Sequence, residues 1–173
     1  MAENKANISL NTPFTDELFV DELQNPWGMA FLPDGSMLIT EKEGKIIHFI
    51  EGKKILISNV PEVYQRGQGG LLDIVLHPQF TENGWIYITY ASEEGEEKGG
   101  HTALMRAKLK DNALVEKKLL YKATPNTTKG QHFGSRIVFD NDGYLYFSIG
   151  ERGDRDINPQ DITRDGGKTI SNN

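Results

Sequence analysis

The sequence reads Gly28-Met29-Ala30-Phe31-Leu32-Pro33-Asp34-Gly35-Ser36-Met37-Leu38-Ile39-Thr40-Glu41 at the point that decides its fold. One apolar run ends at Leu32, an Asp-Gly pair follows, and a second apolar run begins at Met37. An Asp-Gly pair between two apolar runs is a strong short-range signal for a β-hairpin. The stretch therefore predicts two antiparallel strands joined by a tight turn.

The same hairpin pattern occurs twice more along the chain. The second copy spans 71–90, with its turn at 82–84, and the third spans 137–149, with its turn at 141–143. The turn glycines are 49 and 59 residues apart, close to the period of roughly 40–50 residues that four-stranded propeller blades have. These glycines are Gly35, Gly84 and Gly143.

Repetition on this scale, with β-branched and aromatic runs between turns, favours an all-β chain of radially arranged antiparallel sheets, a β-propeller. A β-sandwich or a Greek-key barrel is the alternative, because an Asp-Gly turn between apolar strands is common in all-β proteins. Three copies in phase, each followed by less apolar runs, favour the propeller. We therefore expect blades of four antiparallel strands.

The length of 173 residues limits how much of a propeller the chain can form. At roughly 50 residues a blade, it holds about two and a half blades. We assign blade 1 to about 15–60, blade 2 to about 61–125 and the start of blade 3 to about 126–173. Because a closed ring needs about four blades or more, we expect either a chain truncated from a longer protein or copies that associate through uncovered blade faces. The ending has no turn or strand pair that would complete a third blade, which favours truncation.

Composition excludes several classes of function. The net charge is −6 and no basic stripe is present, so a nucleic-acid partner is not expected. No apolar run is long enough for a membrane-spanning helix. The sequence has no cysteine, which excludes disulfides, thiolate nucleophiles and cysteine-bound metals. The first residues, 1–6, lack the apolar stretch of a secretory signal.

The third hairpin has reactive residues at its open end. Gln131 and His132 precede its first apolar run, and Glu151 and Arg152 follow its second. Because paired strands bring their open ends side by side, we expect His132 and Glu151 to be neighbours. A histidine oriented by a carboxylate suits a general base. A histidine at a strand start is also common as a structural residue, so spacing alone leaves both interpretations open.

Oxygen-rich residues follow this segment. Alternating carboxylate and amide side chains suit calcium, but the run lacks the glycine and the terminal glutamate of an EF-hand loop. A solvated acidic loop is the alternative, and we assign no metal ligand within the chain. The residues are Asp154, Asp156, Asn158, Gln160 and Asp161. The remaining histidines, His48, His77 and His101, are assigned to structure.

Several segments together resemble the glucose/sorbosone dehydrogenase family. Their order and spacing make the resemblance more specific than any one of them, and it covers about 25–168. It implies a six-bladed β-propeller that uses pyrroloquinoline quinone (PQQ) and calcium to oxidise aldose sugars, in the periplasm or outside the cell. The segments are Asn25-Pro26-Trp27-Gly28, Gly67-Gln68-Gly69-Gly70, His77-Pro78-Gln79-Phe80, Gln131-His132-Phe133-Gly134 and Gly150-Glu151-Arg152-Gly153.

The resemblance also implies a role for each site residue. His132 would be the general base that takes the proton from the anomeric hydroxyl while hydride passes to PQQ, and Glu151 would orient it. Gln68 would face sugar and cofactor. Gln131 stands where glucose-oxidising members carry an aspartate, so we expect a broader aldose specificity. The resemblance places the calcium ligands mostly outside this chain. From the residues alone, Arg152 is, like Arg136 and Arg155, a cation near the site that suits the carboxylates of PQQ. The alternative is that the charges of the run 154–156 neutralise one another.

Two other functions stay open. A non-catalytic propeller fragment would bind a protein or a carbohydrate through its blade ends. A calcium-dependent lactonase would attack with a metal-bound water, and His132 would be incidental. The sequence contains no motif that marks a docking surface for the electron acceptor.

Overall fold

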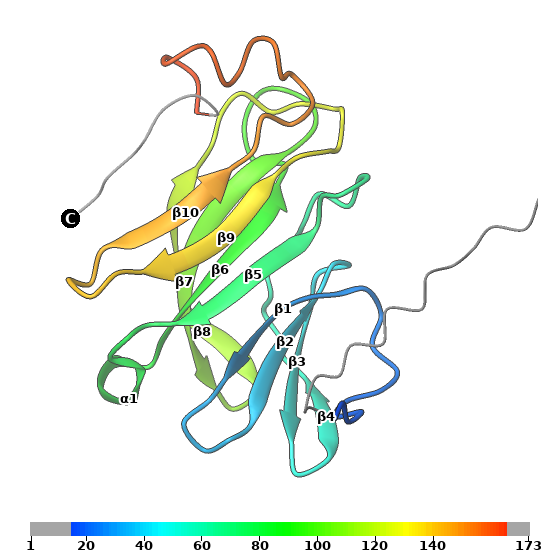
Figure 1. The fold of residues 1–173 in the computed structure, drawn as a ribbon, viewed down its shortest axis with the longest axis vertical. Coiled ribbons are helices and arrows are strands. Elements are labelled where there is room, and N and C mark those ends of the chain that lie inside the picture. The colour runs from blue at the N-terminus through cyan, green and yellow to red at the C-terminus, as the bar shows by residue number, and fades with distance from the viewer. Residues whose placement is uncertain (1–14, 166–173) are drawn as a thin grey trace, which may run out of the picture.

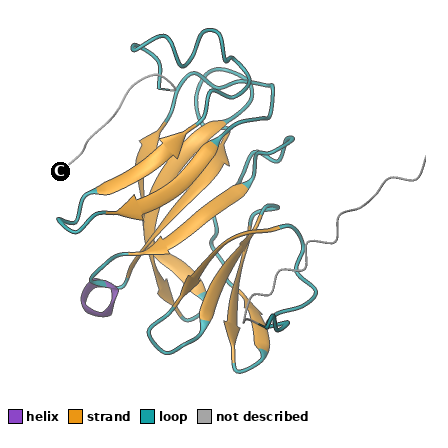
Figure 2. Cartoon of the chain, in the orientation of Figure 1, coloured by secondary structure: helices purple, strands orange, loops and turns teal. Residues whose placement is uncertain are grey.

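Residues 15–165 are described by the computed structural model of the chain. Two four-stranded antiparallel sheets and one two-stranded sheet follow one another along the chain (Figure 1). Figure 2 shows strands and loops with very little helix, which confirms the predicted all-β class. The range assigned to the third blade extends into 166–173, which lies outside the described residues, as does the segment 1–6.

The first sheet has its strands in chain order, so each strand pairs with the next. Its first hairpin is the one that opens the sequence analysis, and Leu32 N donates to Ser36 O across the turn at 2.8 Å. The strands are β1 (Pro26–Phe31), β2 (Met37–Glu41), β3 (Lys45–Ile50) and β4 (Lys53–Leu56).

The second sheet repeats this order. Its strands are β5 (Leu71–Leu76), β6 (Trp85–Ser92), β7 (His101–Lys110) and β8 (Ala113–Lys122). A single helical turn, α1 (Phe80–Asn83), lies between β5 and β6 where the sequence predicted only a tight turn. Gly84 ends this helix in the left-handed region, with φ 68°. No helix within residues 15–165 is long and apolar enough to cross a membrane.

The third sheet is the hairpin of β9 (Gly134–Phe139) and β10 (Leu145–Ile149). Gly143 N donates to Asp140 O at its tip, as Gly35 N donates to Leu32 O in the first hairpin. Gly35 and Gly143 have φ 84° and 86°, a backbone conformation that L side chains rarely adopt. The hairpins predicted from the sequence are therefore present.

Apolar side chains fill the spaces between successive sheets. Leu38 and Ile46 of the first sheet pack with Ile74 and Ile88 of the second, and all four are fully buried. Burial of a side chain of this size contributes about 1.5–3 kcal/mol. The second and third sheets share another cluster, whose buried members are Tyr87, Leu104 and Ile137.

Each hairpin has a β-bulge at the same position. The register shifts between Pro26 and Met29 in β1, and between Leu71 and Ile74 in β5. In the third hairpin the shift lies between Phe147 and Ile149. In every case two residues of the first strand lie opposite one hydroxyl residue of the second strand, which is Thr40, Thr89 or Ser148.

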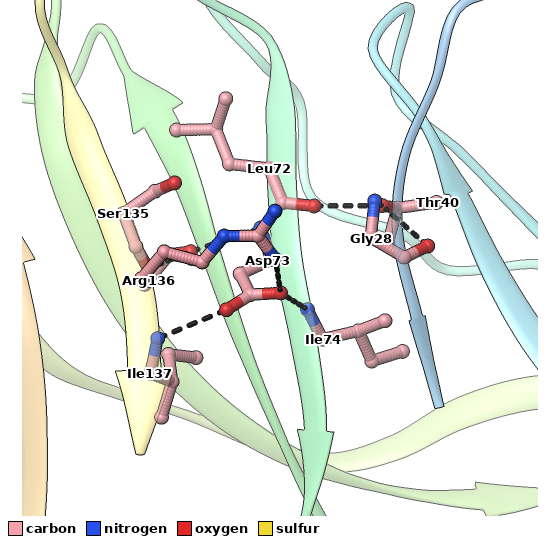
Figure 3. A network of polar contacts seen from close by, with 9 residues as sticks. Gly28, Thr40, Leu72, Asp73, Ile74, Ser135, Arg136 and Ile137 are labelled. Atoms are coloured by element: carbon pink, nitrogen blue, oxygen red, sulfur yellow. Dashed lines mark hydrogen bonds and ion pairs between the residues drawn. The ribbon is translucent and has the colours of Figure 1, made fainter. Parts of the chain in front are cut away.

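The two threonines use their hydroxyls to join neighbouring sheets. Thr40 Oγ1 accepts from Gly28 N at 2.8 Å and donates to Leu72 O of the next sheet at 2.6 Å (Figure 3). Thr89 Oγ1 accepts from Asp73 N at 3.1 Å and donates to Ser135 O at 2.9 Å. The same pair of hydrogen bonds therefore links the first sheet to the second and the second sheet to the third.

A buried carboxylate strengthens the second junction. Asp73 is 3% exposed, and its Oδ2 accepts from Ile137 N of β9 at 2.9 Å (Figure 3). Its Oδ1 accepts from Ile74 N at 3.1 Å and pairs with Arg136 Nη1 at 3.2 Å. Hydrogen bonds to a charged acceptor are stronger than neutral ones, so Asp73 ties β5 to β9 beside the bulge of each strand.

We expect Thr89→Val to lower the free energy of unfolding by about 2 kcal/mol, because Asp73 N and Ser135 O lose their partner inside the protein. Thr89→Ser is the matched control, since it keeps the hydroxyl and loses only a methyl group. Urea unfolding followed by circular dichroism measures both. A Thr89→Val protein as stable as the wild type would show that the hydroxyl does not hold the sheets together.

Candidate active site

The open end of the third hairpin brings His132 and Glu151 into contact. His132 lies two residues before β9 and Glu151 two residues after β10. Arg152 N donates to His132 O at 3.1 Å, which continues the pairing of the two chain segments beyond the strands. His132 Nδ1 is hydrogen-bonded to Glu151 Oε1. The predicted neighbour relation is therefore confirmed, while the catalytic role of the pair stays a prediction.

Several contacts hold Glu151 in place. Its Oε2 accepts from Gly153 N, and its carbonyl oxygen accepts from Asn158 Nδ2 at 2.9 Å. Burial raises the pKa of Glu151, but the hydrogen bonds from His132 and Gly153 outweigh it and leave the pKa below its ordinary value. The carboxylate is therefore ionised at neutral pH.

An ionised carboxylate at Nδ1 determines what the other ring nitrogen can do. The neutral imidazole carries one proton, and a carboxylate partner keeps that proton on Nδ1. The Nε2 atom of His132 then has a free lone pair. Because the side chain is 40% exposed, this lone pair is accessible to a ligand.

Gln68 reaches the same site from the loop between β4 and β5. Its Oε1 accepts from His132 N at 2.7 Å, and its backbone N donates to Gly130 O at 2.8 Å. His132 has φ 54°, a conformation that is uncommon for a residue other than glycine. The Gln68 amide therefore stabilises the turn that presents the histidine, and its NH₂ group stays available to a ligand.

Two glycines allow the backbones around the site to approach closely. A Cβ atom on Gly150 would collide with His132 O, and one on Gly67 would collide with Gly130 O. Gly67 also has φ 58°. Larger residues at these positions would separate the loops that carry Gln68, His132 and Glu151.

The other two predicted site residues are placed differently. The side chain of Gln131 is half-buried and lies against Gly153, close to the His132–Glu151 pair. Arg152 is 0% exposed, and its Nε and Nη1 atoms have no hydrogen-bond partner among the described residues. Burial lowers the pKa of Arg152 to about 10, although Glu151 and Asp165 raise it. A contact between Arg152 and a cofactor stays a prediction.

His101 is buried like Arg152, and the charge of Arg152 acts on its ring. It is 0% exposed, and its Nδ1 accepts from Thr102 N at 2.7 Å. Burial lowers the pKa of His101 to about 3, and the positive charges of Arg152 and Lys122 add to the effect. His101 is therefore neutral at physiological pH, in keeping with the structural role assigned to it.

The oxygen-rich segment after the site is used in contacts within the protein. Asp154 pairs with Lys129 Nζ at 2.5 Å, and Asn158 Oδ1 accepts from Arg164 Nη1 at 2.9 Å. Asp161 Oδ1 accepts from Thr163 N at 2.9 Å. Within residues 15–165 there is no group of three or more His, Cys, Asp or Glu residues that could hold a metal ion. These contacts favour the interpretation of the segment as an ordinary acidic loop.

Two contributors to the site were not recognised in the sequence. Asn158 was considered only as a calcium ligand, but it is fully buried and supports the backbone of Glu151. Asp73 is a charged residue within the apolar stretch 71–76, and this was a signal that it has a buried partner. The two loops that meet at the site come from distant parts of the sequence, so spacing alone could not pair them.

We expect Glu151→Gln to lower the free energy of unfolding by about 1 kcal/mol at pH 7. Because the pKa of Glu151 is lowered from 4.5, its charge stabilises the fold above pH 4.5, and this contribution is lost as the pH falls through the lowered pKa. Urea unfolding at pH 7 and between pH 4.5 and 3 measures the difference. A difference that does not shrink in acid would contradict the assignment.

His101 predicts a separate pH dependence. Its pKa is about 3 in the folded chain and 6.5 in the unfolded chain, so below pH 6.5 only the unfolded chain binds this proton. The free energy of unfolding therefore decreases as the pH is lowered below 6.5, by about 2 kcal/mol between pH 6.5 and pH 5. His101→Gln should remove this loss. The check is urea unfolding at the two pH values, and an equal loss in wild type and variant would refute it.

Comparison with known proteins gives a family for the chain. Residues 23–173 match the family model described as Glucose / Sorbosone dehydrogenase. The chain is 38% identical over 159 residues to aldose sugar dehydrogenase YliI of Escherichia coli, covering 89% of this chain and 42% of the relative. It is 28% identical over 152 residues to human Hedgehog-interacting protein, covering 76% of this chain and 21% of the relative.

Solved structures agree with this result. The apo form of the soluble aldose sugar dehydrogenase from Escherichia coli superposes with a TM-score of 0.76 at 37% identity, over 82% of this chain and 42% of that chain. The PQQ-bound aldose sugar dehydrogenase from Streptomyces coelicolor gives a TM-score of 0.72 at 28% identity, over 87% of this chain and 45% of that chain. The chain thus spans less than half the length of these relatives, its sheets form a partial β-propeller, and it belongs to the glucose/sorbosone dehydrogenase family.

Proposed function

We propose that this chain supplies the proton-accepting part of a quinoprotein that oxidises the anomeric carbon of aldose sugars to lactones. The observation that carries the proposal is the contact of His132 Nδ1 with the ionised carboxylate of Glu151. Membership of the family supports it, and so do relatives named as aldose sugar dehydrogenases.

In this proposal His132 is the general base. Its Nε2 lone pair accepts the proton of the anomeric hydroxyl as the carbon is oxidised. Glu151 keeps the imidazole in the reactive tautomer and then stabilises the imidazolium that forms. Gly153 N donates to Oε2 of Glu151, and this hydrogen bond keeps the other carboxylate oxygen directed at the imidazole of His132.

The amide side chains would set the substrate range. Gln68 already uses its oxygen to bind His132 N, so only its NH₂ group is left to donate to a sugar hydroxyl. Gln131 is neutral where the resemblance implies an aspartate in glucose-oxidising members. A neutral amide holds a hydroxyl less tightly than a carboxylate does, and we therefore propose broad aldose specificity.

The described residues fit one side of a PQQ site. A half-exposed imidazole and a free amide donor lie together there, and both suit a polar quinone and a sugar. When bound, PQQ would supply the carbonyl carbon that takes up the hydride. Calcium belongs to the same proposal, with ligands mostly outside this chain. A location in the periplasm or outside the cell follows from the family resemblance.

A binding function is the second candidate, because one relative carries the name Hedgehog-interacting protein. A chain of that kind would bind a protein through its blade ends without turnover. The two functions differ in their dependence on His132, since only oxidation needs a base at that position.

We expect His132→Asn to lower dye reduction by a factor of about 10²–10⁴, and Glu151→Gln to lower it less, because the base itself is still present. The assay adds PQQ, calcium, an aldose and an artificial electron acceptor to the chain alone, and to the chain joined to the remaining part of the Escherichia coli relative.

His48→Asn is the matched control for this assay. His48 lies in the first sheet, where its Nε2 contacts Ser36 Oγ at 2.9 Å, so turnover should be unchanged. Turnover that survives His132→Asn would refute the base. Binding of a protein ligand without turnover in either form of the chain would favour the second candidate.

A further inference from the structure

A pocket of about 410 Å³ lies on the face of the second sheet that packs against the first. Tyr90 of β6, Met105 of β7 and Leu119 of β8 line it from the sheet. The segment 61–63, which joins the two sheets, lines it as well. Both sheets have four strands, so the pocket belongs to a junction between two whole sheets.

Tyr90 brings an unpaired hydroxyl group to this pocket. The residue is 5% exposed, and it has no hydrogen-bond partner among residues 15–165. Burial raises the pKa of Tyr90 to about 12, and the negative charge of Glu94 adds to the effect. The hydroxyl is therefore neutral at physiological pH, and it can both accept and donate a hydrogen bond. Buried polar groups are nearly always paired, which makes this hydroxyl a contact point for a ligand.

Carboxylates line the same pocket. They belong to Glu62, Glu93 and Glu94, which are all exposed to solvent. Lys117 is the basic residue of the lining, and its Nζ donates to the carbonyl oxygen of Asn59 at 2.9 Å. The lining therefore carries a net negative charge, which attracts cations.

Two of these carboxylates stand on a loop that Asn126 holds in place. Its Nδ2 donates to three carbonyl oxygens of the loop, those of Glu93, Glu94 and Glu97, at 3.3, 3.2 and 3.0 Å. Lys122 Nζ donates to Asn126 Oδ1 at 2.6 Å, which fixes the orientation of the amide. The backbone of the loop is thus ordered without a ligand, so binding costs little conformational entropy there.

The described residues favour an organic cation over a metal ion. Within residues 15–165 no group of three or more His, Cys, Asp or Glu residues could hold a metal ion. An ammonium group has three donors, which suit the Tyr90 hydroxyl and the carboxylates together. Val63, Met105 and Leu119 offer apolar surface to the carbon chain of the same ligand.

We propose that this pocket binds a primary ammonium group carried on an apolar stem. The Tyr90 hydroxyl accepts one of its hydrogen bonds, and Glu94 supplies the opposite charge. The inference rests on the junction of the first two sheets and does not depend on the proposed function.

Hexylammonium is the probe for the chain, and isothermal titration calorimetry and the NMR shift of the Met105 methyl group measure its binding. We expect saturable binding that weakens as the salt concentration rises, because salt screens exposed carboxylates. 1-Hexanol has the same stem without the charge and should bind about tenfold more weakly. Hexanoate has the opposite charge and should not bind.

Two substitutions locate the probe. Tyr90→Phe should weaken binding about tenfold, because it removes the hydroxyl and keeps the ring. Glu94→Gln should weaken binding by a similar factor and reduce its dependence on salt. Tyr146→Phe and Glu82→Gln are the matched controls, because both residues are exposed and lie outside the pocket, so binding should be unchanged. Circular dichroism confirms the folding, and Glu94→Gln, at an exposed position, keeps the test open if Tyr90→Phe does not fold.

Hexylammonium that does not saturate the chain, or that binds either folded variant as tightly as the wild type, overturns the proposal. Equal binding of 1-hexanol overturns it as well, because the pocket would then recognise only the apolar stem. Nα-acetyl-lysine methylamide separates two sources of the ammonium group. Tighter binding of this compound than of hexylammonium would assign the pocket to a lysine side chain of another protein, and weaker binding would assign it to a free amine.

Discussion

A threonine hydroxyl at the bulge of each of the first two hairpins makes the contact on which the arrangement of the sheets depends. Thr40 and Thr89 each accept a backbone hydrogen bond from their own hairpin and donate one to the next sheet. A buried hydroxyl that lost either partner would leave backbone groups unpaired, at a cost of about 1–3 kcal/mol each. Apolar packing holds the sheets together, but it is not directional, and these hydrogen bonds set how each sheet is placed against the next.

The candidate site depends on the same placement. His132 and Glu151 come from the two ends of one hairpin, whereas Gln68 comes from the loop that precedes the second sheet. The Gln68 amide reaches His132 N across the junction of the second and third sheets, which Thr89 and Asp73 join at their bulges. The chemistry of the site therefore rests on a junction that itself touches no substrate.

Local sequence signals were sufficient for the hairpins and for the His132–Glu151 contact. A glycine turn between apolar runs needs only neighbouring residues, and a hairpin joins its own two ends. The helical turn at 80–83 was missed because four residues are too few to show a helical period. The burial of Arg152 and the role of Asn158 were missed for another reason, since both depend on what packs against them from elsewhere in the chain.

By itself, the sequence determined the strands, the glycine turns and the identity of the groups at the open end of the third hairpin, because each of these follows from residues that are close along the chain. Only the tertiary structure decided which faces are covered and which are exposed, that Gln68 binds the backbone of His132, and that Arg152 has no exposed surface. These features arise from contacts between sheets, and a contact between sheets joins residues whose separation in sequence carries no signal.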